Sequence, residues 1–311
     1  MEASHQILLY YKYVWIEDPQ ALMRAQTDLC KLLRLKGRII VAHEGINGTV
    51  EGLTENTARY IETMRTDPRF KDIHFKKSEG TGAAFPRLSV KVRSEIVTGS
   101  LKNLDVNPNE VTGTYLTAEQ LHAWIHGSAD GKAGRKEFFI VDMRNDYEYK
   151  VGRFEGSLNP KLDNFRDLQA ALPKLEHLRD KTVVTVCTGG VRCEKASGFL
   201  VKNGFKEVYQ LFGGIVTYME KYPQEDFKGS LYVFDGRIVM SFNSPTIPHE
   251  VVSQCEKCAS PSEHYVNCTN NFCHKHFICC EACVDKTEKR PFCSAACREK
   301  VASLISTASR A

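Results

Sequence analysis

The chain has 311 residues, a formal net charge of +4 and 12 cysteines. A length of this order predicts two or three domains rather than one. The mild charge excludes no class of partner, but no apolar run is long enough for a membrane span, so we expect no membrane partner. No N-terminal stretch has the pattern of a signal peptide, so we expect a cytoplasmic protein.

Residues 1–100 alternate strand-like and helix-like segments in the order β-α-β-β-α-β, which predicts a ferredoxin-like (acylphosphatase-like) α+β domain. We expect Gly37 to end the first helix and His43–Gly48 to form a turn, because Asn47-Gly48 is a strong hairpin signal. The expected strands are Ile7–Ile16, Gly37–Ala42, Thr49–Gly52, Ile73–Phe75 and Leu88–Val92, and the expected helices are Asp18–Leu35 and Thr54–Arg65.

Basic residues and the segment around His43 suggest that this domain binds RNA. The segment carries more polar groups than a turn needs, and a cluster of lysines and arginines follows later in the domain. A solvated charged face with no partner is the alternative. The candidate RNA-binding residues are Arg38, His43, Glu44, Asn47, Lys76, Lys77, Arg87, Lys91 and Arg93.

A polar linker at residues 101–113 is expected to lead into an α/β domain at residues 114–228. Strands and helices alternate from Phe138 to Tyr222, which predicts a parallel sheet covered by helices on both faces. The β-branched run Thr182–Val186 reads as a buried strand and is followed by a loop and a helix from Cys193 to Asn203. This loop should lie at the carboxyl edge of the sheet, where such folds bind ligands.

The loop Cys187-Thr188-Gly189-Gly190-Val191-Arg192-Cys193 is the candidate active-site loop. A glycine-rich turn before a helix lets backbone N–H groups point inward and adds the positive potential of the helix N-terminus. A cysteine at its start should therefore ionise readily and be nucleophilic. We assign Cys187 and Arg192 as catalytic, with Arg192 holding an anion or stabilising the thiolate. A buried structural cysteine beside a glycine turn is the alternative.

Four residues separate Cys187 from Arg192, a shorter loop than that of cysteine phosphatases. This spacing resembles the rhodanese family, in which the cysteine carries a persulfide. Asp142 and Arg144, after the strand Phe138–Val141, resemble the acidic-x-Arg element of rhodanese domains and are assigned supporting roles. Gly213-Gly214-Ile215 resembles the closing turn of that domain.

The C-terminal part is expected to be a hairpin linker at residues 229–250 and a small Cys-rich module at 251–311. Paired cysteines at short spacing place two thiolates on one tetrahedral metal, so four pairs suit two structural zinc ions. A disordered thiol-rich tail is the alternative, and the pairs that share an ion stay open. The expected ligands are Cys255, Cys258, Cys268, Cys273, Cys280, Cys283, Cys293 and Cys297, with Cys279, His264, His274 and His276 as further candidates.

Four segments in this order resemble the bacterial tRNA uridine(34) hydroxylase family: Gly37–Val50, Arg87–Val97, Val141–Glu148 and Cys187–Ala196. The resemblance implies an oxidoreductase that uses molecular oxygen to form 5-hydroxyuridine at the wobble position of the tRNA anticodon loop. It also places the essential cysteine of the family at Cys187. The alternatives are a rhodanese-type sulfurtransferase and a noncatalytic adaptor that binds proteins through its zinc module.

The chemistry of the thiol stays open at this point. The sequence has no flavin or nicotinamide signal and no facial-triad pattern for iron. A thiolate at Cys187 could add to carbon 6 of uracil and activate carbon 5, or it could carry a persulfide. Cys193 could be a resolving thiol or a packing residue.

Overall fold

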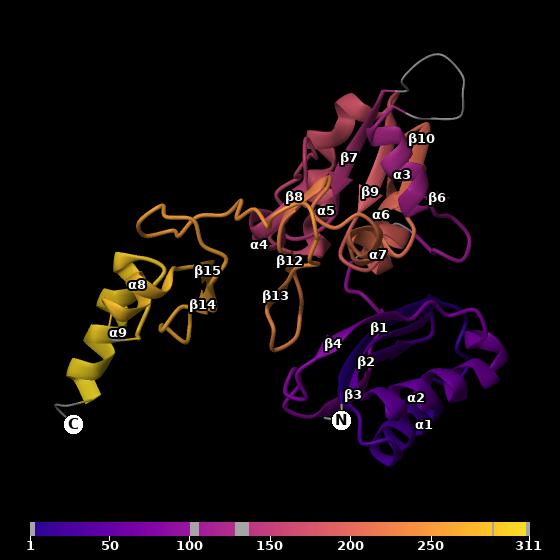
Figure 1. Ribbon diagram of the computed structural model, residues 1–311, viewed down its shortest axis with the longest axis horizontal. Helices are drawn as coiled ribbons and strands as arrows, with labels where there is room; N and C mark the ends of the chain where they lie inside the picture. Colours follow the sequence, from indigo (N-terminus) through magenta and orange to yellow (C-terminus); the bar gives the residue numbers. More distant parts are fainter. Residues whose placement is uncertain (1–3, 100–105, 128–136, 288, 309–311) are drawn as a thin grey trace.

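The computed structural model describes residues 4–99, 106–127, 137–287 and 289–308 (Figure 1). Residues 101–105 of the expected linker therefore lie outside the described residues. The N-terminal domain occupies one end of the molecule, the α/β domain lies above its sheet, and the Cys-rich module lies to one side. No helix among the described residues is long and apolar enough to cross a membrane.

The N-terminal domain is a five-stranded sheet in the order β4-β1-β3-β2-β5. β1 is antiparallel to β3 and β4, β2 is antiparallel to β3, and β2 is parallel to β5. The bounds are β1 His5–Tyr13, α1 Pro19–Leu32, β2 Lys36–Ala42, β3 Gly45–Leu53, α2 Thr54–Thr66, β4 Lys76–Gly80 and β5 Leu88–Val92. The expected ferredoxin-like order is confirmed, and α1 and α2 cover one face of the sheet (Figure 1).

Three local predictions in this domain were wrong. The β2–β3 turn is His43-Glu44, because Ala42 pairs with Gly45, and Asn47-Gly48 lies inside β3. Gly37 lies inside β2 and does not end α1. The expected strand at Ile73–Phe75 begins only at Lys76, because Ile73 and Phe75 pack into the core under the helices.

The second domain is built on a parallel sheet in the order β6-β10-β9-β7. One face packs against α3 and α7 and the other against α5 and α6, as predicted. The bounds are β6 Thr114–Leu116, α3 Ala118–Ile125, β7 Phe138–Asp142, α4 Asp146–Val151, β8 Gly152–Phe154, α5 Leu168–Ala171, β9 Thr182–Val186, α6 Val191–Lys202, β10 Glu207–Leu211 and α7 Gly214–Lys221.

Short antiparallel pairs complete the chain. β8 pairs with β11, and the expected hairpin is formed by β12 and β13. The Cys-rich module contains one small β pair and two helices. The bounds are β11 Phe227–Gly229, β12 Leu231–Tyr232, β13 Val239–Met240, β14 Tyr265–Asn267, β15 His276–Ile278, α8 Glu281–Asp285 and α9 Ala295–Ala308.

Candidate functional site

The Cys187 loop connects the end of β9 to the start of α6. Gly190 caps α6 with φ +101°, a left-handed conformation that favours glycine, and its N–H donates to Cys187 Sγ at 3.2 Å. The backbone N–H groups of Ile215 and Val216 donate to the carbonyls of Cys187 and Thr188, at 2.9 and 3.0 Å. These two hydrogen bonds therefore attach the loop to the N-terminal end of α7.

The Cys187 thiol is fully buried, yet its pKa is below that of an ordinary thiol. Burial opposes ionisation, yet the Cys193 thiol, the charge of Arg192 and backbone N–H groups stabilise the thiolate and lower the pKa of Cys187 to about 6. Burial and the neighbouring Cys187 raise the pKa of Cys193 well above its ordinary value. At neutral pH the charge therefore resides on Cys187, which is the form needed for nucleophilic chemistry.

Arg192 forms a bidentate ion pair with Glu148 of α4, with nitrogen–oxygen distances of 2.5 and 2.8 Å. Both groups are buried, so the guanidinium is oriented by Glu148 and its charge stabilises the Cys187 thiolate. Two roles were expected for Arg192, binding of an anion and stabilisation of the thiolate. This geometry suits stabilisation of the thiolate.

Asp142 and Arg144 do not line the loop. They form a fully buried ion pair, and Arg144 Nη2 also donates to the carbonyl of Gly152 at 2.6 Å. The pair thus holds the end of β7 against β8. α4, which carries Glu148, begins immediately afterwards, so the supporting role expected for the pair stays a prediction that this position allows.

The sheet of the N-terminal domain lies directly against the active-site loop. A Cβ atom at Gly189 would lie 2.9 Å from Leu9 Cδ2, and one at Gly190 would lie 2.7 Å from Tyr11 Oη. The loop glycines are therefore needed for the approach of β1 as well as for the turn. Leu9 and Tyr11 together cover the loop that contains the buried thiol.

A buried carboxylate, Glu194, joins the two domains. It accepts hydrogen bonds from the hydroxyls of Tyr11 and Tyr115, at 3.0 and 2.9 Å. The Thr112 hydroxyl and the Gln210 amide also donate to it, each at 3.0 Å. These donors compensate the negative charge of the buried Glu194 carboxylate. The hydrogen bond from the Tyr11 hydroxyl also holds Tyr11 over Gly190.

A buried lysine makes a second connection between the domains. Lys195 is 1 % exposed and its Nζ lies 2.9 Å from Glu44 and 3.0 Å from Glu95. Glu44 also accepts the backbone N–H of Ile96 at 2.7 Å. Glu44 is therefore part of the domain interface, which is a different placement from the RNA contact expected for it.

Lys76 also differs from expectation, because its side chain is 3 % exposed and not on an open basic surface. Its Nζ lies 4.9 Å from the centre of the Tyr11 ring, a cation–π contact. Burial lowers the pKa of Lys76 to about 8, against the opposing effect of negative charge on Cys187, Glu220 and Glu194. The negative charge on Cys187 is the largest of these opposing effects, so the charges of Lys76 and the Cys187 thiolate stabilise each other.

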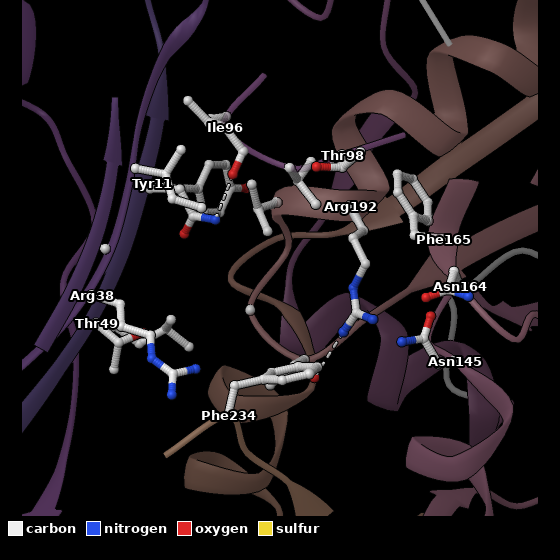
Figure 2. A pocket seen from close by; sticks show the side chains of 18 of the residues that line it. Tyr11, Arg38, Thr49, Ile96, Thr98, Asn145, Asn164, Phe165, Arg192 and Phe234 are labelled. Atoms are coloured by element: carbon white, nitrogen blue, oxygen red, sulfur yellow. Dashed lines mark hydrogen bonds between the residues drawn. The ribbon is translucent and has the colours of Figure 1, made fainter. Parts of the chain in front are cut away.

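A cavity of about 430 Å³ lies between the N-terminal sheet and the loop. Figure 2 shows Arg38 and Thr49 on the sheet side, Arg192, Asn145 and Asn164 on the other side, and Phe234 between them. Arg166 and the rings of Phe85, Phe165 and Tyr11 also line it, together with Thr188, Gly189 and Val191 of the loop. The buried Oδ1 atom of Asn145 has no hydrogen-bond partner among the described residues.

The other expected RNA-binding residues are distributed over the domain. Arg38 and Asn47 line the cavity, and Asn47 donates to the carbonyl of Ile96 at 3.0 Å. His43 stacks on Trp15 with ring centres 5.2 Å apart. Lys77, Arg87, Lys91 and Arg93 are exposed.

Several site residues were not predicted from the sequence: Tyr11, Asn145, Glu148, Glu194, Lys195 and Phe234. Glu194 and Lys195 directly follow the loop in a helix whose positions are buried from Arg192 to Leu200, but the charged residues in its sequence gave no sign of this burial. Tyr11 and Phe234 come from other domains, and no local pattern connects them with Cys187.

The eight expected thiols form two groups of four in the Cys-rich module. The first is Cys255, Cys258, Cys280 and Cys283, and the second is Cys268, Cys273, Cys293 and Cys297. The pairs therefore alternate along the chain, first with third and second with fourth. Cys279, His264, His274 and His276 belong to neither group.

The sulfur positions suit a tetrahedral ion. A Zn–S bond of 2.3 Å gives a sulfur–sulfur separation of about 3.8 Å. The distances are 3.6 Å for Cys258–Cys280, 3.5 Å for Cys273–Cys293 and 3.6 Å for Cys293–Cys297. Both groups can therefore hold a metal such as zinc.

Comparisons with known proteins identify the family. Family models for a UPF0176 acylphosphatase like domain, a rhodanese-like domain and a rhodanase C-terminal region match residues 5–96, 117–221 and 228–298. The tRNA uridine(34) hydroxylase of Cytophaga hutchinsonii is 42 % identical over 95 % of this chain and 90 % of its own. That of Bacillus licheniformis is 44 % identical over 90 % of this chain and 85 % of its own. The chain belongs to the tRNA uridine(34) hydroxylase family.

In this family member, titration of Cys187 tests the geometry of the loop. The ultraviolet absorbance of its thiolate should rise with a midpoint at about pH 6 and stay constant above it. The difference between the protein and Cys187→Ser isolates this signal from the other thiols. Lys76→Met should move the midpoint to higher pH because it removes a nearby positive charge, whereas Lys77→Met should leave it in place. An unchanged midpoint in Lys76→Met would contradict the role of Lys76.

Metal removal tests the Cys-rich module. We expect two thiolate-bound zinc ions per chain, released when a mercurial modifies the thiols and detected with a zinc-sensitive dye. Cys283→Ser should lose one of them, and Cys279→Ser, a matched control outside both groups, should lose none.

Stripping this zinc should unfold residues 255–297 and leave the rhodanese-like domain folded, because that domain has its own core. Amide exchange before and after stripping measures both parts. Retention of exchange protection across 255–297 without metal would contradict the assignment.

Proposed function

We propose that this protein hydroxylates carbon 5 of uridine 34 in tRNA with molecular oxygen as co-substrate, and that Cys187 is its catalytic residue. The observation that carries the proposal is the cavity shared by the N-terminal sheet and the Cys187 loop. A sulfurtransferase acting on a small sulfur donor does not need a second domain to line its active-site cavity. The proposal also rests on the activity named for the family's curated members.

The walls of the cavity have the chemistry of an RNA site. RNA is read mainly through single-stranded bases that stack on aromatic rings and through phosphates that meet arginine or lysine. The exposed Phe234 supplies a ring on which a base can stack, the buried Phe85 and Phe165 complete the apolar lining, and Arg38 and Arg166 supply positive charge. A splayed anticodon base entering between the domains would meet all of these groups.

One polar atom in the cavity suits a uracil edge. Asn145 Oδ1 is a buried acceptor without a partner, and leaving such an atom unsatisfied costs about 1–3 kcal/mol. The N3–H of uracil is a donor of the right kind. We assign Asn145 as the residue that reads the Watson–Crick edge of the target base.

The thiolate of Cys187 offers two routes to carbon 5. It can add to carbon 6 of uracil, which makes carbon 5 electron-rich, and leave again when the carbon 5 proton is lost, or it can act through a persulfide. In either route a two-electron reductant from outside the chain reduces the second oxygen atom of O2 to water. In either case Leu9 and Tyr11 must move from the loop, because they cover it in this conformation. Arg192, oriented by Glu148, keeps the thiol ionised until then.

A sulfurtransferase is the second candidate. The observation in its favour is the low pKa of a cysteine within a rhodanese-like domain. Transfer of sulfane sulfur from thiosulfate to cyanide by the purified protein, at a rate abolished in Cys187→Ser, would support it. Such transfer without any effect of the protein on tRNA would replace the hydroxylase proposal.

The hydroxylase proposal is tested by complementation. In cells that lack the protein, wild type should restore 5-hydroxyuridine in tRNA, measured by nucleoside mass spectrometry. Cys187→Ser should restore none, because the thiolate carries the chemistry. Cys193→Ser should retain more activity, because its raised pKa keeps it a neutral thiol. Full activity of Cys187→Ser would contradict the assignment of Cys187.

The RNA proposal is tested by salt dependence. Binding of tRNA should weaken steeply with salt, because phosphate contacts release counterions. Each of Arg38→Ala, Lys91→Ala and Arg93→Ala should reduce the log–log slope by about 0.7 per lost contact to single-stranded RNA. Arg24→Ala is the matched control, since Arg24 is exposed on α1, on the opposite face of the sheet. Binding by the wild type without salt dependence would contradict the proposal.

A further inference from the structure

A cluster of two histidines and two carboxylates lies on the rhodanese-like domain, away from both groups of four cysteines. His122 and His126 are four residues apart at the end of α3, so they lie on one face of the helix. Glu225 and Asp226 follow α7 and approach them from the neighbouring segment. One ligand atom from each residue lies within 4.8 Å of all the others.

The distances within the cluster are close to those of a tetrahedral site. His122 Nε2 lies 2.9 Å from Glu225 Oε2 and 4.0 Å from Asp226 Oδ2, and His126 Nε2 lies 3.1 Å from Asp226 Oδ1. Bonds of 2.0–2.2 Å from zinc to nitrogen and oxygen place the ligand atoms about 3.3–3.6 Å apart. Shifts of less than about 1 Å would therefore exchange the histidine–carboxylate contacts for bonds to one ion.

The types of ligand atom in the cluster indicate which class of metal ion it can bind. Imidazole nitrogen with carboxylate oxygen suits zinc and other late first-row divalent ions, whereas magnesium and calcium prefer oxygen alone. His126 is exposed and His122 is half-buried, so an ion can enter from solvent.

The surroundings hold the ligands in place, as expected for a metal site. The Tyr218 hydroxyl donates to Asp226, and His122 stacks on Tyr222 with ring centres 3.9 Å apart. The backbone carbonyl of Asp226 accepts the N–H of Glu155 at 3.0 Å. Gln224, at φ +63° and 2 % exposed, turns the chain so that the next two residues face α3.

We propose that His122, His126, Glu225 and Asp226 bind one divalent transition-metal ion, of which zinc is the representative, separately from the two thiolate sites. The ion joins α3 to the end of α7. The other end of α7 holds the carbonyls of Cys187 and Thr188. α7 has eight residues, which places the metal about 12 Å along the helix from the loop and gives it a structural rather than a reacting role.

Metal stoichiometry of the full chain tests this site. After equilibration in a zinc buffer, elemental analysis should find three zinc ions per chain in the wild type and two in His122→Ala/His126→Ala. Glu225→Gln should bind the third ion more weakly. His177→Ala is the matched control, because His177 is exposed and lies outside the cluster, and it should keep three.

Cobalt provides a second, spectroscopic readout of the same site. Cobalt added to wild-type protein with its thiolate sites filled by zinc should give visible ligand-field bands without thiolate-to-cobalt charge-transfer absorption. Retention of mercurial-releasable zinc in the double variant shows that the rest of the chain is intact. Two zinc ions in the wild type, or equal cobalt binding by wild type and double variant, would overturn the proposal.

Discussion

The close contact between β1 and the Cys187 loop is the constraint on which the site depends. A thiol in an open loop would be solvated, but here the Leu9 and Tyr11 side chains lie where any side chain at Gly189 or Gly190 would be. The thiol is therefore in a medium of low dielectric constant, where its ionisation depends on Arg192, Cys193 and backbone N–H groups. Removing water from the loop strengthens each of these interactions.

The domain interface is held together mainly by buried charge. Glu194 accepts hydrogen bonds from four side chains, and Lys195 lies between Glu44 and Glu95. Removing one partner of such a buried pair costs about 3–5 kcal/mol, because the other charge stays buried. Polar interfaces of this kind fix one orientation of the domains.

The sequence was sufficient to predict features that depend on local patterns. The buried strand Thr182–Val186, the glycine loop and the helix after it were predicted because each has its own signal. The eight cysteines that form the two groups were identified for the same reason, although their alternating partnership depends on the path of the chain. The expectation for Asn47-Gly48 was wrong because these residues serve tertiary contacts. Asn47 binds the carbonyl of Ile96, and a Cβ at Gly48 would lie 2.4 Å from Tyr10.

The environments of the charged residues could not be predicted from the sequence. Lys76, Lys77 and Lys91 look alike in the sequence, but Lys76 lies beneath Tyr11 and the other two are exposed. Whether a lysine becomes an interface charge or a surface charge depends on which strand covers it, and no local pattern records that. For the same reason, no local pattern connects Cys187 with Tyr11 and Phe234, which are distant from it along the chain.

We propose that the N-terminal sheet and the Cys187 loop form one site for the wobble base. Photo-crosslinking with tRNA that carries 4-thiouridine at position 34 tests it most directly, with mass spectrometry to map the linked peptides. We expect crosslinks both to β1–β3 of the N-terminal domain and to the loop from Thr188 to Arg192. Crosslinks confined to the Cys-rich module or to the helical face of the N-terminal domain would contradict it.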